Sequence, residues 1–227
     1  MPSTKKNIID VMTYPQLSNH KSKIGYVLMK RLIDFIVSFI GLIVLLPVFV
    51  MITLIMKCSE PKAPIFFAHT RNGKAGKKFK MYKFRTMCQD AETILMKDRT
   101  LFEKFKTNGY KFETHEDPRV TKVGGLLRKT SLDELPQLIN VCLGHMSLVG
   151  PRPLPDREII EYGEELYKFL SVKPGITGWW QVSGRSNVNY PERCHLELHY
   201  VENSSLAFDA YILLKTVVIV LMRVGAH

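Results

Sequence analysis

The chain has 227 residues, of which 46% are hydrophobic, and this is enough for one folded domain with appendages. Its 32 lysines and arginines outnumber the 21 acidic residues, so the formal charge of +11 indicates an anionic partner. The four cysteines form no C-x-x-C pair, which argues against a zinc site or a disulfide framework. A long hydrophobic run argues against nucleic acid as that partner and favours phosphorylated substrates or an anionic bilayer.

The hydrophobic run follows a polar, basic segment, residues 1–29, which has no signal-peptide cleavage pattern. Residues 35–56 are an uncharged stretch of about 22 residues, and as a straight helix they would reach about 33 Å. A bilayer core is about 30 Å thick, so the stretch is long enough to cross it. Residues 30–57 are therefore predicted to form a membrane helix.

Three features favour a re-entrant helix, which bends and returns to its own side, over a spanning one. Pro47 lies in the middle of the run and predicts a kink. Asp34 and Ser38 lie on the first turns, where they are expected near lipid headgroups. Both ends carry basic residues, so the positive-inside rule is satisfied if both ends stay on the cytoplasmic side: Lys30, Arg31, Lys57 and Lys62. A kinked spanning helix is the alternative.

A second apolar stretch, residues 210–222, is too short to span a membrane. It fits a buried core helix. It equally fits a helix in the plane of the interface, with Lys215 and Arg223 reaching toward headgroups.

Residues 58–227 are predicted to form a separate catalytic domain, which begins with a β-hairpin. Residues 65–67 and 81–84 are the strand candidates, and Arg71-Asn72-Gly73 is the turn signal. Strand alternation places Lys83 and Arg85 on one face, where they fit either a phosphate or a solvated cluster on anionic lipid. One charged helix is expected over residues 90–105.

The most informative segment is residues 128–153, RKTSLDELPQLINVCLGHMSLVGPRP, where Asp133 and Glu134 are adjacent carboxylates among cations. Ser131 followed by Glu134 matches a capping box, and Pro136 is typical of a first helical turn. A helix-capping role and a catalytic role are compatible, because a carboxylate at a helix N-terminus stays ionised and can act as a nucleophile. Arg152 lies between two prolines that suit a rigid phosphate-binding guanidinium, although an ordinary exposed turn is the alternative.

Downstream, KPGITGWWQVSGRS has three glycines and two tryptophans. Such a segment fits a cradle for a nucleotide base and also fits a well-packed loop. Its candidate nucleotide-sugar-binding residues are Gly178, Gln181 and Arg185.

Several long motifs in this order resemble the bacterial sugar transferases, the monotopic polyprenyl-phosphate phosphoglycosyl transferases. The matching motifs are KRLIDFIVSFIGLIVLLP, YKFRTM, the stretch from DPRVTKVGGLLRKTSLDELPQ through LVGPRP, KPGITGWWQVSGR and DAYILLKTV. The resemblance implies an α+β, mostly helical fold with a membrane-embedded re-entrant helix, a small cytoplasmic catalytic domain, a short β-hairpin and interfacial amphipathic helices. It also implies a monotopic protein of the bacterial inner membrane, with a homo-oligomer left open.

The resemblance further implies transfer of a sugar 1-phosphate from a UDP-sugar, UDP-glucose or UDP-galactose being favoured, to undecaprenyl phosphate with release of UMP. This is the first committed step of exopolysaccharide, capsule or O-antigen synthesis. By resemblance Asp133 is the nucleophile and Glu134 completes the dyad, with both near Mg²⁺. The phosphate-binding residues would be Lys83, Arg85, Arg128 and Arg152.

Two other hypotheses stay open at this point. An ordinary glycosyltransferase would release UDP, but such enzymes often carry a D-x-D metal motif, and none occurs here. A membrane-anchored scaffold of a polysaccharide assembly complex would not need the reactivity of Asp133.

Overall fold

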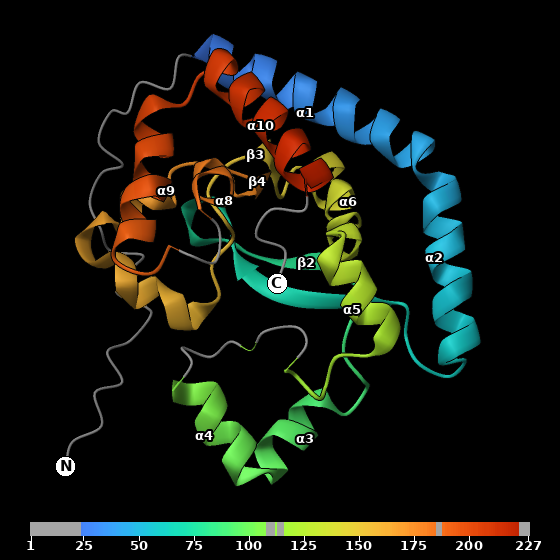
Figure 1. Ribbon diagram of the computed structural model, residues 1–227. Coiled ribbons are helices and arrows are strands. Elements are labelled where there is room, and N and C mark those ends of the chain that lie inside the picture. Colours follow the sequence, from blue (N-terminus) through green and yellow to red (C-terminus); the bar gives the residue numbers. More distant parts are fainter. Residues whose placement is uncertain (1–23, 108–111, 113–115, 185–187, 223–227) are drawn as a thin grey trace, which may run out of the picture.

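The computed structural model describes residues 24–107, 112, 116–184 and 188–222. It is mostly helical with a small antiparallel β-hairpin, as predicted (Figure 1). Two long helices, α1 (Ile24–Val44) and α2 (Leu46–Ser59), form the N-terminal part, and α1 begins before the predicted start at residue 30. Arg185 and Arg223 lie outside the described residues.

The bend predicted in the hydrophobic run is present. The two helices meet at 56°, and the break lies at Leu45. Pro47 therefore falls in the first turn of α2, where its missing N–H would have no helical partner in any case. Among the described residues, no single helix has the length and apolarity to cross a membrane, while this bent pair meets those two criteria together.

The polar residues of α1 contact protein, and the prediction that Asp34 and Ser38 lie near headgroups is wrong. Both side chains are buried. Asp34 Oδ1 accepts the backbone N–H of Leu148 at 3.0 Å, and Ser38 Oγ lies 3.0 Å from Cys142 Sγ. Arg31 donates to the carbonyls of Val141 and Cys142 at 2.6 and 2.8 Å. These bonds attach α1 to the catalytic domain, because burying such groups without partners would be costly.

The predicted hairpin is confirmed and is longer than expected, but the turn predicted at residues 71–73 lies too early, since Arg71 and Asn72 belong to the first strand and the chain turns over residues 73–77. Strands β1 (Phe66–Asn72) and β2 (Lys78–Phe84) pair in antiparallel register, so that His69 lies opposite Met81. The connection contains a short 3₁₀ turn, η2 (Lys74–Gly76), with Ala75 and Gly76 at positive φ. Met81 and Phe79 of β2 are buried in the main core.

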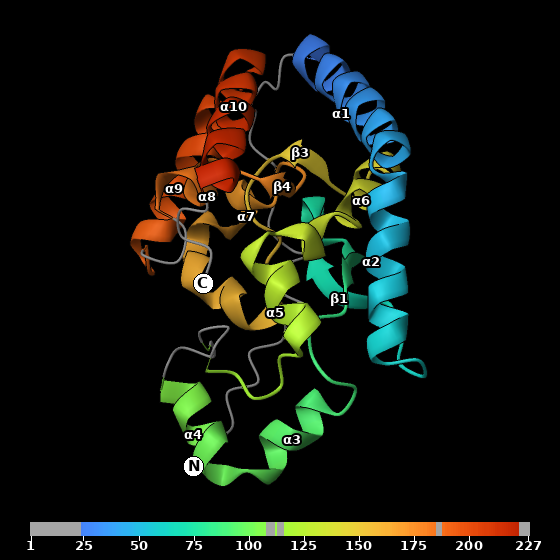
Figure 2. The ribbon, with the colours of Figure 1, turned by 45° about the vertical axis from the view of Figure 1, so that its right-hand side comes forward.

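The single helix expected over residues 90–105 is two helices, α3 (Ala91–Lys97) and α4 (Arg99–Thr107). Asp98 interrupts them, since its Oδ1 accepts the backbone N–H of Leu101 at 2.9 Å and so starts a new helix. The pair projects away from the other helices in both views (Figures 1 and 2).

The rest of the domain surrounds a core formed by β2, the β3–β4 pair and the C-terminal helices. Strands β3 (Ser147–Val149) and β4 (Gly175–Thr177) form a parallel pair that the sequence did not indicate. The other elements are α5 (Lys122–Lys129), η3 (Leu132–Glu134), α6 (Gln137–Cys142), η4 (Asp156–Glu165), α7 (Leu166–Phe169), α8 (Trp179–Ser183), α9 (Glu192–Asn203) and α10 (Leu206–Met222).

Helix α10 covers the predicted C-terminal apolar stretch; one face packs in the core as predicted, and the position of its exposed face in a membrane interface stays a prediction. Ile212 is fully buried, while Leu214 is 69% exposed. Near its start, the buried Asp209 accepts from Lys30 at 2.7 Å and from Tyr200 at 2.7 Å. This shared carboxylate joins the starts of α1 and α10 to α9, and the two helices diverge beyond this contact (Figure 2).

Candidate active site

The adjacent carboxylates lie in η3, the 3₁₀ turn between α5 and α6. Asp133 is buried and Glu134 is half-buried. Ser131, just before the turn, has a left-handed backbone with φ of 56°, and its side chain makes no capping bond. The predicted capping box is therefore wrong, because a capping serine needs extended backbone at that position. Strained backbone of this kind is often found at functional sites.

Lys83 links the hairpin to both carboxylates. Its Nζ lies 2.5 Å from Glu134 Oε1 and 3.9 Å from Asp133 Oδ2. Asn140 of α6 holds strand β2 in place for this contact. Its amide accepts the N–H of Tyr82 at 2.9 Å and donates to the carbonyl of Lys80 at 2.7 Å.

Arg152 approaches the same carboxylates from the loop after β3. Its Nη1 lies 3.9 Å from Glu134 Oε1. The buried Glu197 of α9 accepts the backbone N–H of Arg152 with both oxygens, at 3.2 and 3.0 Å. The Gly/Pro segment, from which a rigid arginine was predicted, is thus held in place by Glu197, which is distant in sequence.

Arg128 and Arg85 differ in placement. Arg128 donates from Nε to Thr86 Oγ1 at 2.9 Å, and Asp133 is close enough to act on its charge. Arg85 follows the end of β2, and its guanidinium binds the carbonyls of Pro64 and Met87 and the carboxylate of Glu60. The structure therefore gives Arg85 partners in the loop that leaves α2, and a phosphate role for it stays a prediction.

The two carboxylates have opposite pKa shifts. Burial raises the pKa of Asp133 to about 6, although the charge of Lys83 opposes the rise. Burial acts in the same direction on Glu134, but Lys83, Arg152 and a hydrogen bond from Gln137 outweigh it and bring its pKa below the usual range. Glu134 is thus a permanent anion, and Asp133 is an anion at neutral pH that is only weakly stabilised.

The tryptophan-containing segment packs beside this cluster. A Cβ at Gly178 would meet the carbonyl oxygen of Gly150 at 2.1 Å, so the glycine permits close packing of two backbones. The amide of Gln181 is buried, and neither of its polar atoms has a hydrogen-bond partner among the described residues. The role of these residues in nucleotide-sugar binding stays a prediction, and Arg185 lies outside the described residues.

The comparison with protein families decides the identity. The family model described as "Bacterial sugar transferase" matches residues 25–223, which include the hairpin, the carboxylate pair and the tryptophan segment. The chain belongs to the bacterial sugar transferase family. The resemblance seen in the sequence motifs is confirmed.

Similar proteins place this sugar transferase among enzymes of the transferase class. It is 39% identical to "Exopolysaccharide production protein ExoY" of Sinorhizobium fredii over all of both chains. It is 41% identical to "Undecaprenyl-phosphate galactose phosphotransferase" of Salmonella typhimurium, covering 93% of this chain and 44% of the relative. It is 39% identical to "UDP-glucose:undecaprenyl-phosphate glucose-1-phosphate transferase" of Escherichia coli, covering 84% and 39%.

The sequence did not single out several residues that build this site of the sugar transferase. Asn140 and Glu197 position Lys83 and Arg152, but an asparagine inside a helix and a glutamate in α9 carry no motif. Arg193 of α9 lies 4.2 Å above the Trp180 ring and holds Glu158 at 3.0 Å. A cation–π contact between Arg193 and Trp180 could not be predicted from the sequence, because only the fold brings the two residues together.

The carboxylate pair also bears on the predicted Mg²⁺. Among the described residues, no group of three His, Cys, Asp or Glu side chains is arranged to hold a metal ion. Mg²⁺ usually keeps several waters and is bound by one or two carboxylates together with substrate phosphates. Asp133 and Glu134 therefore fit an ion that arrives with a pyrophosphate.

Proposed function

We propose that the protein transfers hexose 1-phosphate from a UDP-sugar to undecaprenyl phosphate and releases UMP. The observation that carries this proposal is the buried Asp133, next to Glu134 and surrounded by Lys83, Arg128 and Arg152. A carboxylate held among cations suits attack on a phosphate, because the cations reduce the repulsion between two anions.

In the first step, an oxygen of Asp133 attacks the β-phosphorus of the UDP-sugar. The bond from that phosphorus to the bridging oxygen breaks, and its electron pair leaves with UMP. The product is an aspartyl phospho-sugar. The nucleophile is already an anion at neutral pH, so the step needs no strong general base.

In the second step, an oxygen of undecaprenyl phosphate attacks the phosphorus of the aspartyl phospho-sugar. The bond to Asp133 breaks, which restores the carboxylate and gives undecaprenyl-diphosphate-sugar. Lys83 and Arg152, which both lie near Glu134 Oε1, hold phosphate oxygens in both steps.

Asp133 and Glu134 would hold Mg²⁺ through carboxylate oxygens. When bound, the ion supplies positive charge that polarises the pyrophosphate. The chain itself orients Glu134 through Lys83 and Gln137, so the pair presents a fixed set of oxygens to the substrate.

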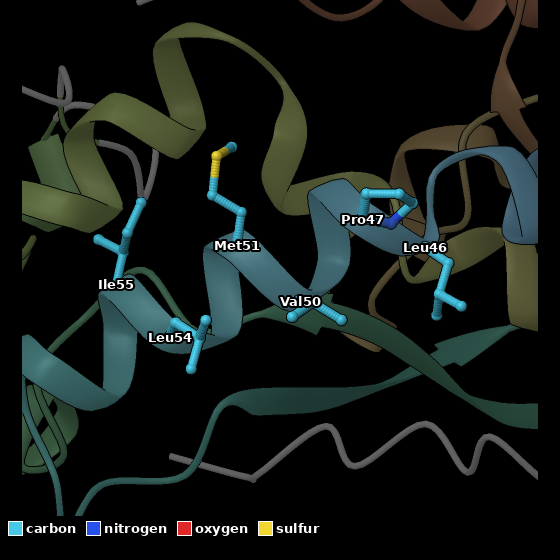
Figure 3. Close-up of a pocket in the computed structure, with 6 residues that line it drawn as sticks. All are labelled: Leu46, Pro47, Val50, Met51, Leu54 and Ile55. Carbon is cyan, nitrogen blue, oxygen red and sulfur yellow. The ribbon is translucent and has the colours of Figure 1, made fainter.

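The apolar side chains that α1, α2 and α10 leave exposed support a membrane position. Six of them lie along α2 and form one apolar surface (Figure 3): Leu46, Pro47, Val50, Met51, Leu54 and Ile55. Apolar side chains clustered at the surface in this way are typical of sites that contact a membrane or another protein. We place the α1–α2 pair in the cytoplasmic leaflet of the bacterial inner membrane as a re-entrant helix, with the catalytic domain on the cytoplasmic face and α10 in the interface.

The sugar is proposed from the relatives. The similar proteins include a galactose phosphotransferase and a glucose-1-phosphate transferase, both named for undecaprenyl phosphate, and an exopolysaccharide production protein. UDP-galactose and UDP-glucose are therefore the donors proposed here, for the initiating step of exopolysaccharide, capsule or O-antigen synthesis.

The test measures nucleotide release by the full-length protein in detergent, with undecaprenyl phosphate, Mg²⁺ and each donor. Release of UMP by the wild type and not by Asp133→Asn supports the proposal. Release of UDP would instead indicate ordinary glycosyl transfer. Equal UMP release by both proteins would remove Asp133 as nucleophile.

A further inference from the structure

A row of side chains, polar except for Phe67, leads away from the carboxylates along one face of the hairpin. Lys83 of β2 lies opposite Phe67, and His69 and Arg71 follow Phe67 at alternate positions of β1. Alternate residues share a face of a strand and are about 6.7 Å apart. The row therefore runs from Lys83, at the carboxylates, through His69 to Arg71.

Arg71 makes no ion pair with an acidic side chain among the described residues, although the charge of Glu158 is close enough to act on it. Its Nη2 lies 3.2 Å from His69 Nδ1, while its Nε is buried and has no hydrogen-bond partner among the described residues. Burial lowers the pKa of Arg71 to about 10, and the charge of Arg152 adds to this effect. A guanidinium in such surroundings stays protonated at neutral pH and favours the approach of an anion.

The nearby carboxylates are occupied by other groups. Glu158 binds Arg193 at 3.0 Å and the hydroxyl of Tyr190 at 3.0 Å. Glu197 binds the backbone of Arg152. No ion pair connects Arg71 to an acidic side chain in the described part of the chain.

A hollow of about 440 Å³ lies beside this row, between β1 and the start of η4. Its size falls within the range of small-molecule sites. It is lined by Ala68, His69, Thr70, Pro155, Asp156 and Arg157. The one carboxylate in the lining, Asp156, is bound by Asn72 at 2.9 Å and by Lys78. Burial and the charge of Arg71 lower the pKa of His69 to about 4, so its imidazole is neutral.

We propose that Arg71, together with Arg152, binds the phosphate of the departing nucleotide, and that the hollow beside His69 receives its nucleoside. This inference rests on the proposed function. Arg152 links the two regions, since its Nη1 is 3.9 Å from Glu134 Oε1 and its charge also acts on Arg71. A diphosphate whose β-phosphorus meets Asp133 would then place its α-phosphate toward Arg71.

An arginine at this position also suits the negative charge that develops on the leaving nucleotide. When the phosphorus–oxygen bond breaks, the electron pair stays on the bridging oxygen, and the α-phosphate gains one negative charge. A planar guanidinium can bind that phosphate through two N–H groups, which a lysine cannot do. The sugar carries no such charge and does not require an arginine.

The experiment measures equilibrium binding of UMP, uridine and glucose 1-phosphate to the full-length protein in detergent, without turnover. The variants are Arg71→Gln, Arg71→Lys and a matched control, Lys80→Gln. Lys80 is an exposed residue of the same hairpin, so the control removes the same charge. Thermal unfolding of each variant checks that it is folded.

We expect Arg71→Gln to weaken UMP binding about tenfold, Arg71→Lys to weaken it less, and Lys80→Gln to leave it unchanged. Uridine and glucose 1-phosphate should bind equally to all of these proteins. Unchanged UMP binding in Arg71→Gln, or a loss that affects glucose 1-phosphate instead, would overturn the proposal. A wild type that does not bind UMP would also overturn it.

The two proposals fail separately. If UMP binding depends on Arg71 but turnover releases UDP, only the proposed reaction is wrong. If turnover releases UMP but Arg71 has no effect on UMP binding, only the nucleotide site is wrong.

Discussion

Lys83 Nζ lies 2.5 Å from Glu134 Oε1, although 51 positions separate the two residues in the chain. The contact fixes the hairpin against the turn that carries the carboxylates. It also directs the negative charge of Glu134 toward a cation and leaves Asp133, 3.9 Å from the same ammonium group, as the less stabilised anion. The contact thus separates the roles of two adjacent acidic residues.

Replacing Lys83 with glutamine should lower kcat/KM about 100-fold or more, because the variant loses both a phosphate-binding charge and the partner of Glu134. Steady-state release of UMP measures the effect. Lys80→Gln is the control, since Lys80 lies on the same strand and is exposed. Equal rates for the two variants would show that the total positive charge of the hairpin affects the rate and that the position of Lys83 does not.

The pH dependence of the first step should reflect Asp133. Because burial raises its pKa to about 6, the ionised fraction and kcat/KM should fall about tenfold per pH unit below that value. Single-turnover UMP release without undecaprenyl phosphate is the measurement, since the lipid phosphate itself titrates near pH 6. In Lys83→Gln the midpoint should move to higher pH, and a midpoint near pH 4 in the wild type would contradict the assignment.

Asp133→Asn should abolish UMP release and leave the fold intact. The folded pKa of about 6 exceeds the ordinary value of 3.8, so the stability that Asp133 contributes is greatest below pH 3.8 and is lost as the pH rises through 6. Asparagine does not ionise. The variant should therefore gain about 2–3 kcal/mol relative to the wild type between pH 4 and pH 7. Thermal unfolding at both pH values tests this, and a less stable variant at pH 7 would contradict it.

Asn140→Ala should destabilise the protein by about 2–4 kcal/mol. The substitution leaves the N–H of Tyr82 and the carbonyl of Lys80 without their partner in a buried setting. Denaturant unfolding gives the free energy. Asn203→Ala is the matched control, because its amide binds only within α9 and is exposed, and it should change stability by less than about 0.5 kcal/mol.

The re-entrant position of the α1–α2 pair predicts that both of its ends lie on the cytoplasmic side. Cys58 at the C-terminal end of α2 is exposed, and a cysteine at Gly25 would meet no atom within 4 Å. In a background where the remaining cysteines are alanine, a membrane-impermeant maleimide should label neither site in intact cells and both after permeabilisation. Labelling of one site alone in intact cells would indicate a spanning helix.

Local patterns in the sequence predicted several secondary-structure features of this protein and its family. The hairpin, the bend near Pro47 and the family follow from strand alternation, a proline in an apolar run and the order of the motifs, all of which depend on near neighbours in the chain. The same reasoning predicted a capping box at Ser131 and one helix across Asp98. Those predictions failed because the backbone at Ser131 is left-handed and the side chain of Asp98 begins a second helix.

Only the tertiary structure decided which charges meet. Lys83 and Arg85 lie only two positions apart in sequence, yet Lys83 reaches Glu134, and Arg85 binds the loop that leaves α2. Asp34 sits in an apolar run and nevertheless binds the backbone of Leu148 across 114 positions. Such pairings depend on distances set by the packing of remote elements, and no local spacing encodes them.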